Sequence, residues 1–154
     1  MPRSVLAIKL RGYRLGDLWK LNGRLIKSAR TTPFWEYQIS VPDSVTMIVD
    51  GKIEACLGCA YNGGGTTVEL WSAPSRRLIE SRPREYSRTV KKILARFSKA
   101  GLIVTVHADP EDEGTLKWLR WLGLRDSGER RGWGDLEIMV MRLNTVKAGG
   151  QGGD

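Results

Sequence analysis

The chain has 154 residues, of which 41% are hydrophobic and 27% are charged, and its formal net charge is +8 at pH 7. This length is enough for one domain with a buried core, and no apolar run approaches the roughly 18 to 20 residues that cross a bilayer. The composition therefore excludes a membrane-spanning helix. The N-terminal segment lacks the apolar stretch and small-residue cleavage site of a secretory signal, so we expect a cytoplasmic protein.

The positive charge is concentrated in two segments. Residues 1–30 contain eight Lys or Arg and one acidic residue, and residues 76–101 contain nine and two, so each segment has a net charge of +7. Residues 31–75 and 102–154 are acidic, at −4 and −2. Such segments favour a polyanionic partner, namely nucleic acid, an acidic protein or a small phosphorylated cofactor. Nucleic acid is the least favoured, because aromatic residues do not alternate with the basic runs.

The N-terminal third is predicted from its apolar spacing. Residues 4–10 alternate loosely and predict a strand. Residues 15–29 have apolar positions at helical spacing with basic residues opposite, which predicts an amphipathic helix weakened at Gly23. Residues 30–44 are predicted to form a loop anchored by Phe34, Trp35 and Tyr37.

From residue 45 the apolar period changes to two, which predicts three antiparallel strands. The turns between them are expected at Asp50-Gly51 and at the three glycines 63–65. Cys56 and Cys59 form a C-x-x-C pair that raises the possibility of redox chemistry or half a metal site. The only histidine is distant in sequence and no second pair exists, so we favour buried strand cysteines and predict no metal site.

The C-terminal half alternates helices and strands. Residues 80–101 predict the strongest helix, with Pro83 at its start and Gly101 after its end. Residues 102–110 predict a central strand buried on both faces, and residues 111–122 a short helix with an apolar face. Residues 136–143 predict a closing strand, paired with 124–129 across a turn at 130–135. The apolar face of the short helix consists of Leu116, Leu119 and Leu122.

This order of elements predicts an α/β (α+β) fold with a single mixed, mostly antiparallel sheet and helices on both faces. We expect one domain over residues 1–143 and a flexible glycine-rich tail over 144–154.

The segments "LKWLRWLGLRDSGE" (116–129), "DGKIEACLGCAY" (50–61) and "TTVELWSAPS" (66–75) resemble the GNAT (GCN5-related N-acetyltransferase) superfamily. Within it, the chain is most similar to small divergent acetyltransferase-like proteins of bacteriophages. The resemblance implies the GNAT fold, acetyl-CoA as cofactor and an amine as acceptor. A phage origin would place the protein in the host cytoplasm.

Two family features are absent. The family binds the cofactor pyrophosphate with Arg/Gln-x-x-Gly-x-Gly/Ala, whereas the corresponding segment here, "SRRLIESRPREY" (75–86), contains no glycine. The tyrosine that often protonates the departing thiolate is replaced by Leu119.

Glu69 and His107 are the candidate catalytic residues. Glu69 occupies a position resembling that of the catalytic glutamate of the histone-acetylating branch, and a half-buried carboxylate has the raised pKa that a general base needs. His107 follows an apolar strand that ends near the same place. The alternatives are an exposed strand glutamate and a structural histidine.

The candidate cofactor-binding residues lie between the third predicted strand and the long helix. A helix start near residues 81–84 offers free N–H groups to phosphates, with arginine side chains in place of the glycines. The alternative is a solvated basic helix face. The phosphate-binding candidates are Arg76, Arg77, Ser81, Arg82 and Arg84, and the backbone of Trp71, Ser72 and Ala73 would align the pantetheine arm.

Tryptophans provide the remaining candidates. Trp118 and Trp121 have helical spacing beside leucines, which favours core packing over stacking on bases. Trp133, flanked by Arg130 and Arg131, is the candidate contact for a partner protein.

Three functions follow. The first is an acyl-CoA-dependent N-acetyltransferase acting on an unknown amine. The second is a catalytically inactive GNAT-fold protein that binds and modulates a host protein. The third, least favoured, is a basic nucleic-acid-binding protein.

Overall fold

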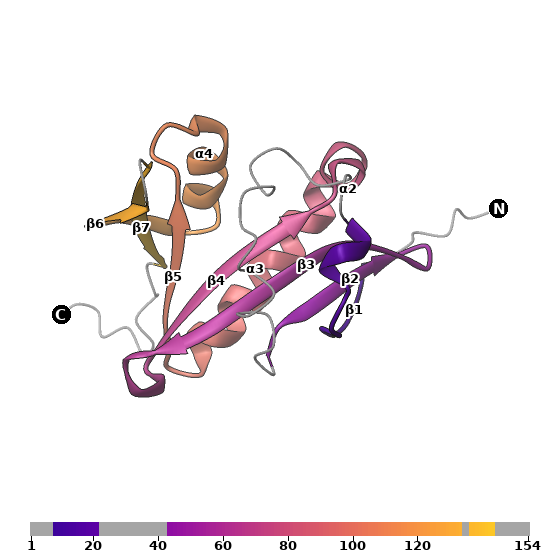
Figure 1. Cartoon of the computed structure of the whole chain (residues 1–154), viewed down its shortest axis with the longest axis horizontal. Helices are drawn as coiled ribbons and strands as arrows, with labels where there is room; N and C mark the ends of the chain where they lie inside the picture. Colours follow the sequence, from indigo (N-terminus) through magenta and orange to yellow (C-terminus); the bar gives the residue numbers. More distant parts are fainter. Residues whose placement is uncertain (1–7, 22–42, 134–135, 144–154) are drawn as a thin grey trace. The chain divides into compact units, whose positions relative to one another are not determined.

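The computed structural model describes residues 8–21, 43–133 and 136–143. Seven strands form one mixed sheet in the order β1-β2-β3-β4-β5-β7-β6 (Figure 1). The elements are β1 (Lys9–Gly12), the 3-10 helix η1 (Leu18–Leu21), β2 (Val45–Val49), β3 (Lys52–Asn62), η3 (Gly63–Gly65), β4 (Thr67–Pro74), α2 (Arg76–Ser81), α3 (Pro83–Lys99), β5 (Ile103–Ala108), α4 (Glu113–Trp121), β6 (Leu124–Trp133) and β7 (Leu136–Leu143). The predicted mixed, mostly antiparallel sheet is confirmed.

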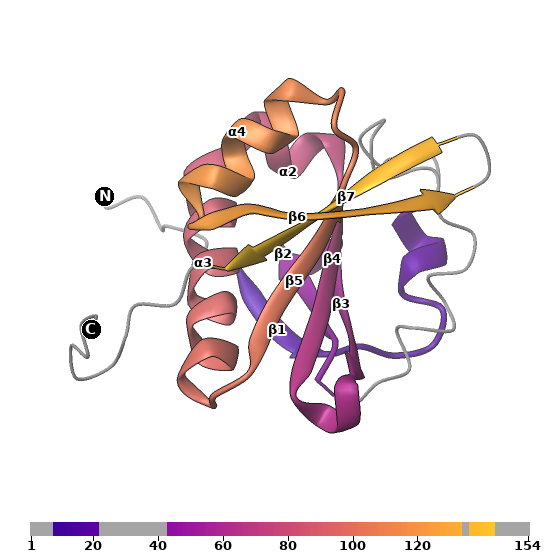
Figure 2. The same cartoon turned by 90° about the vertical axis from the view of Figure 1, so that its left-hand side faces the viewer.

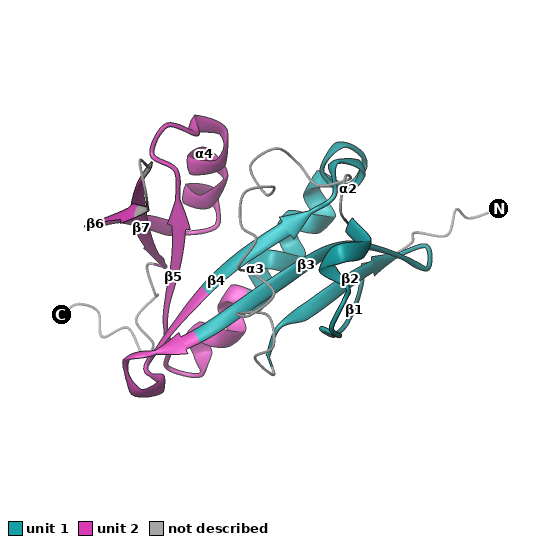
Figure 3. Cartoon of the chain, in the orientation of Figure 1, with its two compact units in different colours: residues 1–60, 70–93 teal, residues 61–69, 94–154 magenta. Residues whose placement is uncertain are grey.

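The chain forms two compact units (Figure 3). The first comprises residues 1–60 and 70–93, and the second comprises 61–69 and 94–154.

The antiparallel meander is present as predicted. β1, β2 and β3 pair antiparallel, and the β2–β3 turn falls at Asp50 and Gly51, whose φ angles are +56° and +73°. Positive φ at both central residues suits a two-residue hairpin turn, because its twist matches that of the strands.

In the first unit, residues of the N-terminal segment pack against residues of β3 and β4. Leu21, Cys56 and Ala73 form a buried cluster, against which Tyr13, Leu18, Ile53 and Trp71 pack. A Cβ atom at Gly58 would lie 2.2 Å from Cζ2 of Trp71, so the indole occupies the space that a side chain would take.

Cys56 and Cys59 are buried free thiols of β3, as predicted. Ser44 Oγ accepts a hydrogen bond from the Cys59 N–H (3.1 Å). Burial raises the pKa of the Cys59 thiol to about 11. A protonated, enclosed thiol is a poor nucleophile, which agrees with a packing role.

The segment 75–86 is more ordered than the turn that the sequence indicates, because it contains the short helix α2. The Ser75 side chain accepts a hydrogen bond from Leu78 N (3.0 Å) and so caps the helix. The chain leaves helical geometry at Arg82, where φ is −139° and ψ is 50°, and α3 then begins at Pro83. The predicted apolar face of α3 is confirmed by its buried residues Tyr86, Val90, Ile93, Leu94 and Phe97.

In the second unit, α4 lies within the predicted residues 111–122, at Glu113–Trp121. Asp112 caps its first turn by accepting from Thr115 N (3.2 Å), and Gly123 follows its end with a φ of +104°. The three leucines of its predicted apolar face are buried. The prediction that Trp121 packs in the core was wrong. The residue is 54% exposed, because its side chain extends from the helix away from that leucine face.

β5 is a strand as predicted, but burial on both faces was wrong. Val104 and Ala108 are buried, whereas Ile103 is 41% exposed and residues 105–107 are only partly buried. β6 and β7 form a long antiparallel hairpin (Figure 2). β6 extends to Trp133, so residues 130–133 are paired strand and not the predicted turn, because the ladder continues to Trp133 opposite Leu136.

Several predictions lie wholly or partly outside the described residues. They are the start of the first strand (4–7), most of the N-terminal helix (22–29), the loop 30–42 and the tail 144–154. Within the described part, a strand occupies Lys9–Gly12, and a 3-10 turn occupies Leu18–Leu21 where the first half of the helix was expected. None of the helices in the described part has the length and apolar character that crossing a membrane requires.

Candidate functional site

The two predicted catalytic residues lie in contact in the second unit. Glu69, near the start of β4, places Oε2 3.2 Å from Nδ1 of His107, near the end of β5. The Glu69 side chain is 17% exposed and that of His107 is 26% exposed, so both are largely shielded but reachable from solvent.

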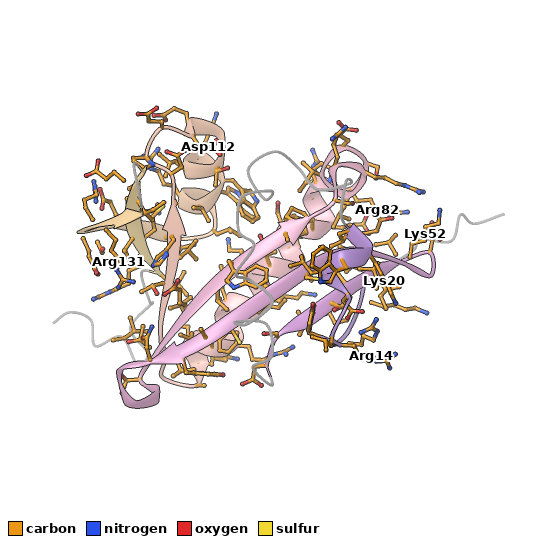
Figure 4. All side chains as sticks on the ribbon, in the orientation of Figure 1. Arg14, Lys20, Lys52, Arg82, Asp112 and Arg131 are labelled. Carbon is orange, nitrogen blue, oxygen red and sulfur yellow. The ribbon has the colours of Figure 1, made fainter. Side chains whose placement is uncertain are left out.

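Arg131 of β6, whose side chain is labelled in Figure 4, contacts both members of this pair. Its Nη1 lies 3.2 Å from His107 Nε2 and 4.0 Å from Glu69 Oε1. Its Nε donates to Oε2 of Glu129 at 2.8 Å. We call Glu69, His107, Glu129 and Arg131 the His107 cluster.

The chemistry of arginine fixes the tautomer of His107. A guanidinium only donates hydrogen bonds, so Nε2 is the acceptor in its contact with Arg131. The ring proton then resides on Nδ1, which lies 3.2 Å from Oε2 of the Glu69 carboxylate. A carboxylate on one ring nitrogen and a proton-accepting position on the other is the arrangement of a histidine general base.

The surroundings keep His107 neutral. Burial lowers its pKa below 6.5, and the charge of Arg131 lowers it further, against the opposing effects of Glu69 and Glu129. A neutral imidazole near pH 7 is the form that can accept a proton.

The register of three strands brings His107 and Arg131 together. His107 pairs with Val140 of β7, and Arg131 pairs with Ile138. Residues two apart in a strand share a face, and paired residues of antiparallel neighbours point to the same side. Both side chains therefore project from one face and meet across β7.

The predicted phosphate-binding residues lie in the first unit, around α2. Arg77, Ser81 and Arg82 contribute to a cavity of about 320 Å³. Its other lining residues are Val49, Asp50, Glu54 and Leu78. Two carboxylates thus share the cavity with two arginines, which weakens its attraction for an anion.

One carboxylate and one arginine of this cavity have partners within the chain. Glu54 is buried and accepts a hydrogen bond from the Ser75 hydroxyl at 2.6 Å. Arg82 forms an ion pair with Glu85 (2.7 Å) in the first turn of α3. Arg76, Arg77 and Arg84 are exposed, and none of them has an acidic partner among the described residues. They are the cations best suited to an added phosphate.

The residues predicted to align the pantetheine arm, 71–73, lie near the end of β4. Trp71 lies over Gly58, and Ala73 is buried in the core of the first unit. Ser72 points to the opposite side, where its hydroxyl accepts from Tyr86 OH at 2.8 Å. Burial raises the pKa of the Tyr86 hydroxyl.

The predicted partner surface comprises residues 130–133, and its two arginines have partners within the chain. Arg130 forms a bidentate pair with Asp126, with both distances 2.9 Å, and Arg131 belongs to the His107 cluster. The side chain of Trp133 lies outside the described part. Both arginines are therefore engaged within the chain and are less available to a partner than the sequence suggests.

Sequence reasoning missed the place of Arg131 and Glu129 beside His107. Their signal is tertiary, because it depends on the pairing register of β6, β7 and β5. Among residues 8–21, 43–133 and 136–143, no three His, Cys, Asp or Glu side chains are arranged so that they could hold a metal ion.

No protein-family model matches the chain, and no curated protein sequence matches it. Solved structures of low sequence identity do match. Ard1 of Thermoplasma volcanium is 11% identical with a TM-score of 0.73, and the match covers 92% of this chain and 100% of that one. Naa50 of Arabidopsis thaliana, solved with a bisubstrate analogue that includes CoA, is 12% identical with a TM-score of 0.65 (91% and 100% covered). An acetyltransferase of Bacillus subtilis, solved with CoA, is 12% identical with a TM-score of 0.65 (92% and 100% covered).

These proteins share their architecture with the chain, and proteins described as GNAT-family acetyltransferases are among the other matches. The chain therefore has the fold of the GNAT acetyltransferases, a single mixed sheet of seven strands.

Proposed function

We propose that the chain is an acyl-CoA-dependent N-acetyltransferase in which His107 is the general base and Glu69 orients it. The observation that supports this most directly is the Glu69–His107 contact at 3.2 Å. In the proposed reaction, Nε2 takes a proton from the acceptor ammonium, and the free amine attacks the acetyl carbonyl. The thioester C–S bond then breaks, and CoA leaves as a thiolate that takes up the proton released by the attacking nitrogen. The Glu69 carboxylate stabilises the imidazolium that forms, as carboxylates do in other histidine bases.

The residues of the first unit fit the charge of acetyl-CoA. The exposed cations Arg76, Arg77 and Arg84 provide donors for its phosphates, and the backbone of residues 71–73 provides hydrogen-bonding groups for its pantetheine arm. When bound, acetyl-CoA supplies the acetyl group as a thioester. Arg82 would join the phosphate contacts only after releasing Glu85, which is a small cost for a partly exposed pair.

No tyrosine is assigned to protonate the leaving thiolate. Leu119 stands at the family position and is buried in α4. Tyr86 is buried and donates to Ser72, so it does not replace that tyrosine.

Calorimetric titration with acetyl-CoA tests the cofactor part of the proposal. We expect the wild type to bind and Arg77→Ala/Arg84→Ala to bind at least tenfold more weakly. Arg96→Ala/Lys99→Ala, at the other end of α3, removes the same charge and should bind like the wild type. The absence of binding by the wild type at millimolar acetyl-CoA would contradict the proposal.

Release of free CoA in the presence of primary amines tests the catalytic part. The panel consists of amino acids, polyamines and short peptides with free N-termini. His107→Gln should lose at least 100-fold in kcat/KM, the range that general base catalysis contributes. Glu69→Gln should lose less, because His107 keeps its position on β5. Equal rates in wild type and His107→Gln would exclude His107 as the base.

A second candidate is a GNAT-fold protein without catalysis that binds a host protein, as a phage product would. The absence of glycine from residues 75–86 and the donor placed on His107 Nε2 both favour it. The phage origin and the host partner depend on the sequence resemblance alone. Folded wild-type protein that neither binds acetyl-CoA nor releases CoA would favour this second candidate.

A further inference from the structure

An irregular stretch of β6 sets the position of Arg131. The register is Asp126 opposite Met141 and then Arg130 opposite Met139, so four steps along β6 match two steps along β7. Two extra residues are thus accommodated in a bulge. Gly128 lies within it with a φ of +89°, a conformation that side chains other than glycine rarely adopt.

Local hydrogen bonds hold this bulge in place. Gly128 N donates to Asp126 Oδ1 at 2.8 Å, and Ser127 Oγ donates to the Val140 carbonyl at 2.7 Å. Glu129 N in turn donates to Ser127 Oγ at 3.1 Å. The Ser127 hydroxyl therefore fastens the bulge to β7 at the residue that pairs with His107.

The bulge decides which charge lies next to His107. If the register of residues 124–126 continued, Glu129 would stand opposite Ile138, whereas the observed register puts Arg131 there. An anion at that point would favour the imidazolium, and the cation favours the neutral ring. Such bulges often redirect a side chain next to an active site.

We infer that Arg131 is a removable cap on His107: the β6 bulge places its guanidinium on Nε2, and His107 becomes a base only when that group turns away. This inference rests on the proposed function. Arg131 is a positioning residue, since it acts through His107.

The geometry supports removal of the cap. The Arg131 side chain is 47% exposed, and its Nε is bound to Glu129, which is 51% exposed. The planar guanidinium turns as a unit, so its release from His107 moves the whole group, and the exposed Glu129 can follow it or let it go. The exposed ion pair adds little free energy that would resist this movement.

The protons balance in the uncapped state. Nε2 presents a lone pair and takes the proton of the acceptor ammonium, while the Nδ1 proton stays on the ring beside the Glu69 carboxylate. In the capped state the same lone pair accepts the Arg131 N–H, so the acceptor cannot deliver its proton. The charged groups that face the ring are Glu69 from β4 and Arg131 and Glu129 from β6.

NMR titration of the imidazole tests the cap without any turnover, because His107 is the only histidine of the chain. Long-range ¹H–¹⁵N spectra give the tautomer and the pKa of the ring in wild type, Arg131→Met and Arg130→Met. Arg130 is the matched control, since it is the adjacent arginine of β6 and pairs with Asp126. Arg131→Lys keeps the charge but loses the planar fork.

We expect the wild type to have its ring proton on Nδ1. In Arg131→Met the pKa of His107 should rise, whereas Arg130→Met should leave it unchanged and Arg131→Lys should lie between wild type and Arg131→Met. A ring proton on Nε2 in the wild type would overturn the inference, and so would an unchanged His107 pKa in Arg131→Met.

The pH profile of kcat/KM links the cap to the reaction. The acidic limb should move upward in Arg131→Met by the same amount as the His107 pKa, and a profile that stays in place would overturn the role of the cap. If the wild type shows no turnover with any amine, the proposed function fails while the NMR result still decides whether Arg131 caps the ring.

Discussion

Two carboxylate clusters of the chain contain similar groups in different surroundings. In the first unit, Asp17 accepts two hydrogen bonds from the Arg11 guanidinium (2.7 and 3.0 Å), one from the Thr46 hydroxyl (2.7 Å) and one from the Arg14 N–H (2.8 Å). Its side chain is only 2% exposed. In the second unit, Glu69 faces a histidine and lies 4.0 Å from an arginine, in partial contact with solvent.

The difference separates a structural cluster from a functional one. Burial by itself would raise the pKa of Asp17, but the hydrogen bonds from Arg11, Thr46 and Arg14 outweigh it, so the pKa lies below 3.8. This carboxylate stays charged and has no proton to exchange near pH 7. In the His107 cluster, the imidazole is neutral, titratable and partly exposed, so it can take part in proton transfer once Arg131 leaves Nε2.

The largest expected effect comes from Asp17→Asn. The change leaves the Arg11 charge without its carboxylate in a largely buried place, which costs about 3 kcal/mol of unfolding free energy. Urea denaturation at pH 7 measures it, with Asp126→Asn as the exposed control, for which we expect no resolved change.

The Asp17 effect should also depend on pH. Because the folded-state pKa lies below 3.8, the stabilisation is present above the unfolded-state pKa and is lost as the pH falls through the folded-state pKa. Wild type and Asp17→Asn should therefore converge in stability in strong acid, and a constant difference down to pH 2 would argue against the charged pair.

Gly58→Ala should destabilise by about 2 kcal/mol, since the new methyl group would overlap the Trp71 indole of a packed core. Gly132→Ala in β6 is the control from the second region, because a Cβ there meets nothing within 4 Å. Denaturant midpoints compare the two. Equal losses for both variants would remove the contrast between a packed region and an open one.

Gly128→Ala should cost about 1 kcal/mol, because alanine is strained at a φ of +89° although space is available. The more informative readout is the His107 pKa, which should rise if the bulge relaxes and Arg131 moves off the ring. Gly132→Ala again serves as control. An unchanged pKa together with the expected loss of stability would mean that the bulge does not hold Arg131.

The smallest expected effect is a pH dependence of the free energy of unfolding, caused by the titration of His107. As the pH falls through 6.5, the unfolded chain binds a proton before the folded chain, because the folded-state pKa is lower. Stability should decrease over that window and stop decreasing below the folded-state pKa. Denaturation between pH 5 and 7.5 should show this slope in the wild type and lack it in His107→Gln.

Much of the fold is readable from local patterns. The Asp50-Gly51 turn, the Pro83 start of α3 and the leucine face of α4 each follow from a few neighbouring residues, and each is present as predicted. Helix α2 was missed, because six residues give too short a period and its cap, Ser75, is recognised by its bond to Leu78.

The sequence by itself determined the order of strands β2 to β7 and of helices α3 and α4, together with the two candidate bases, because apolar period, turn residues and chemically reactive side chains are local properties of the chain. Only the tertiary structure decided that Glu69 contacts His107 and that Arg131 lies on its other nitrogen. The physical reason is register: residues far apart along the chain meet across β7, and a bulge of two residues determines whether an anion or a cation arrives there.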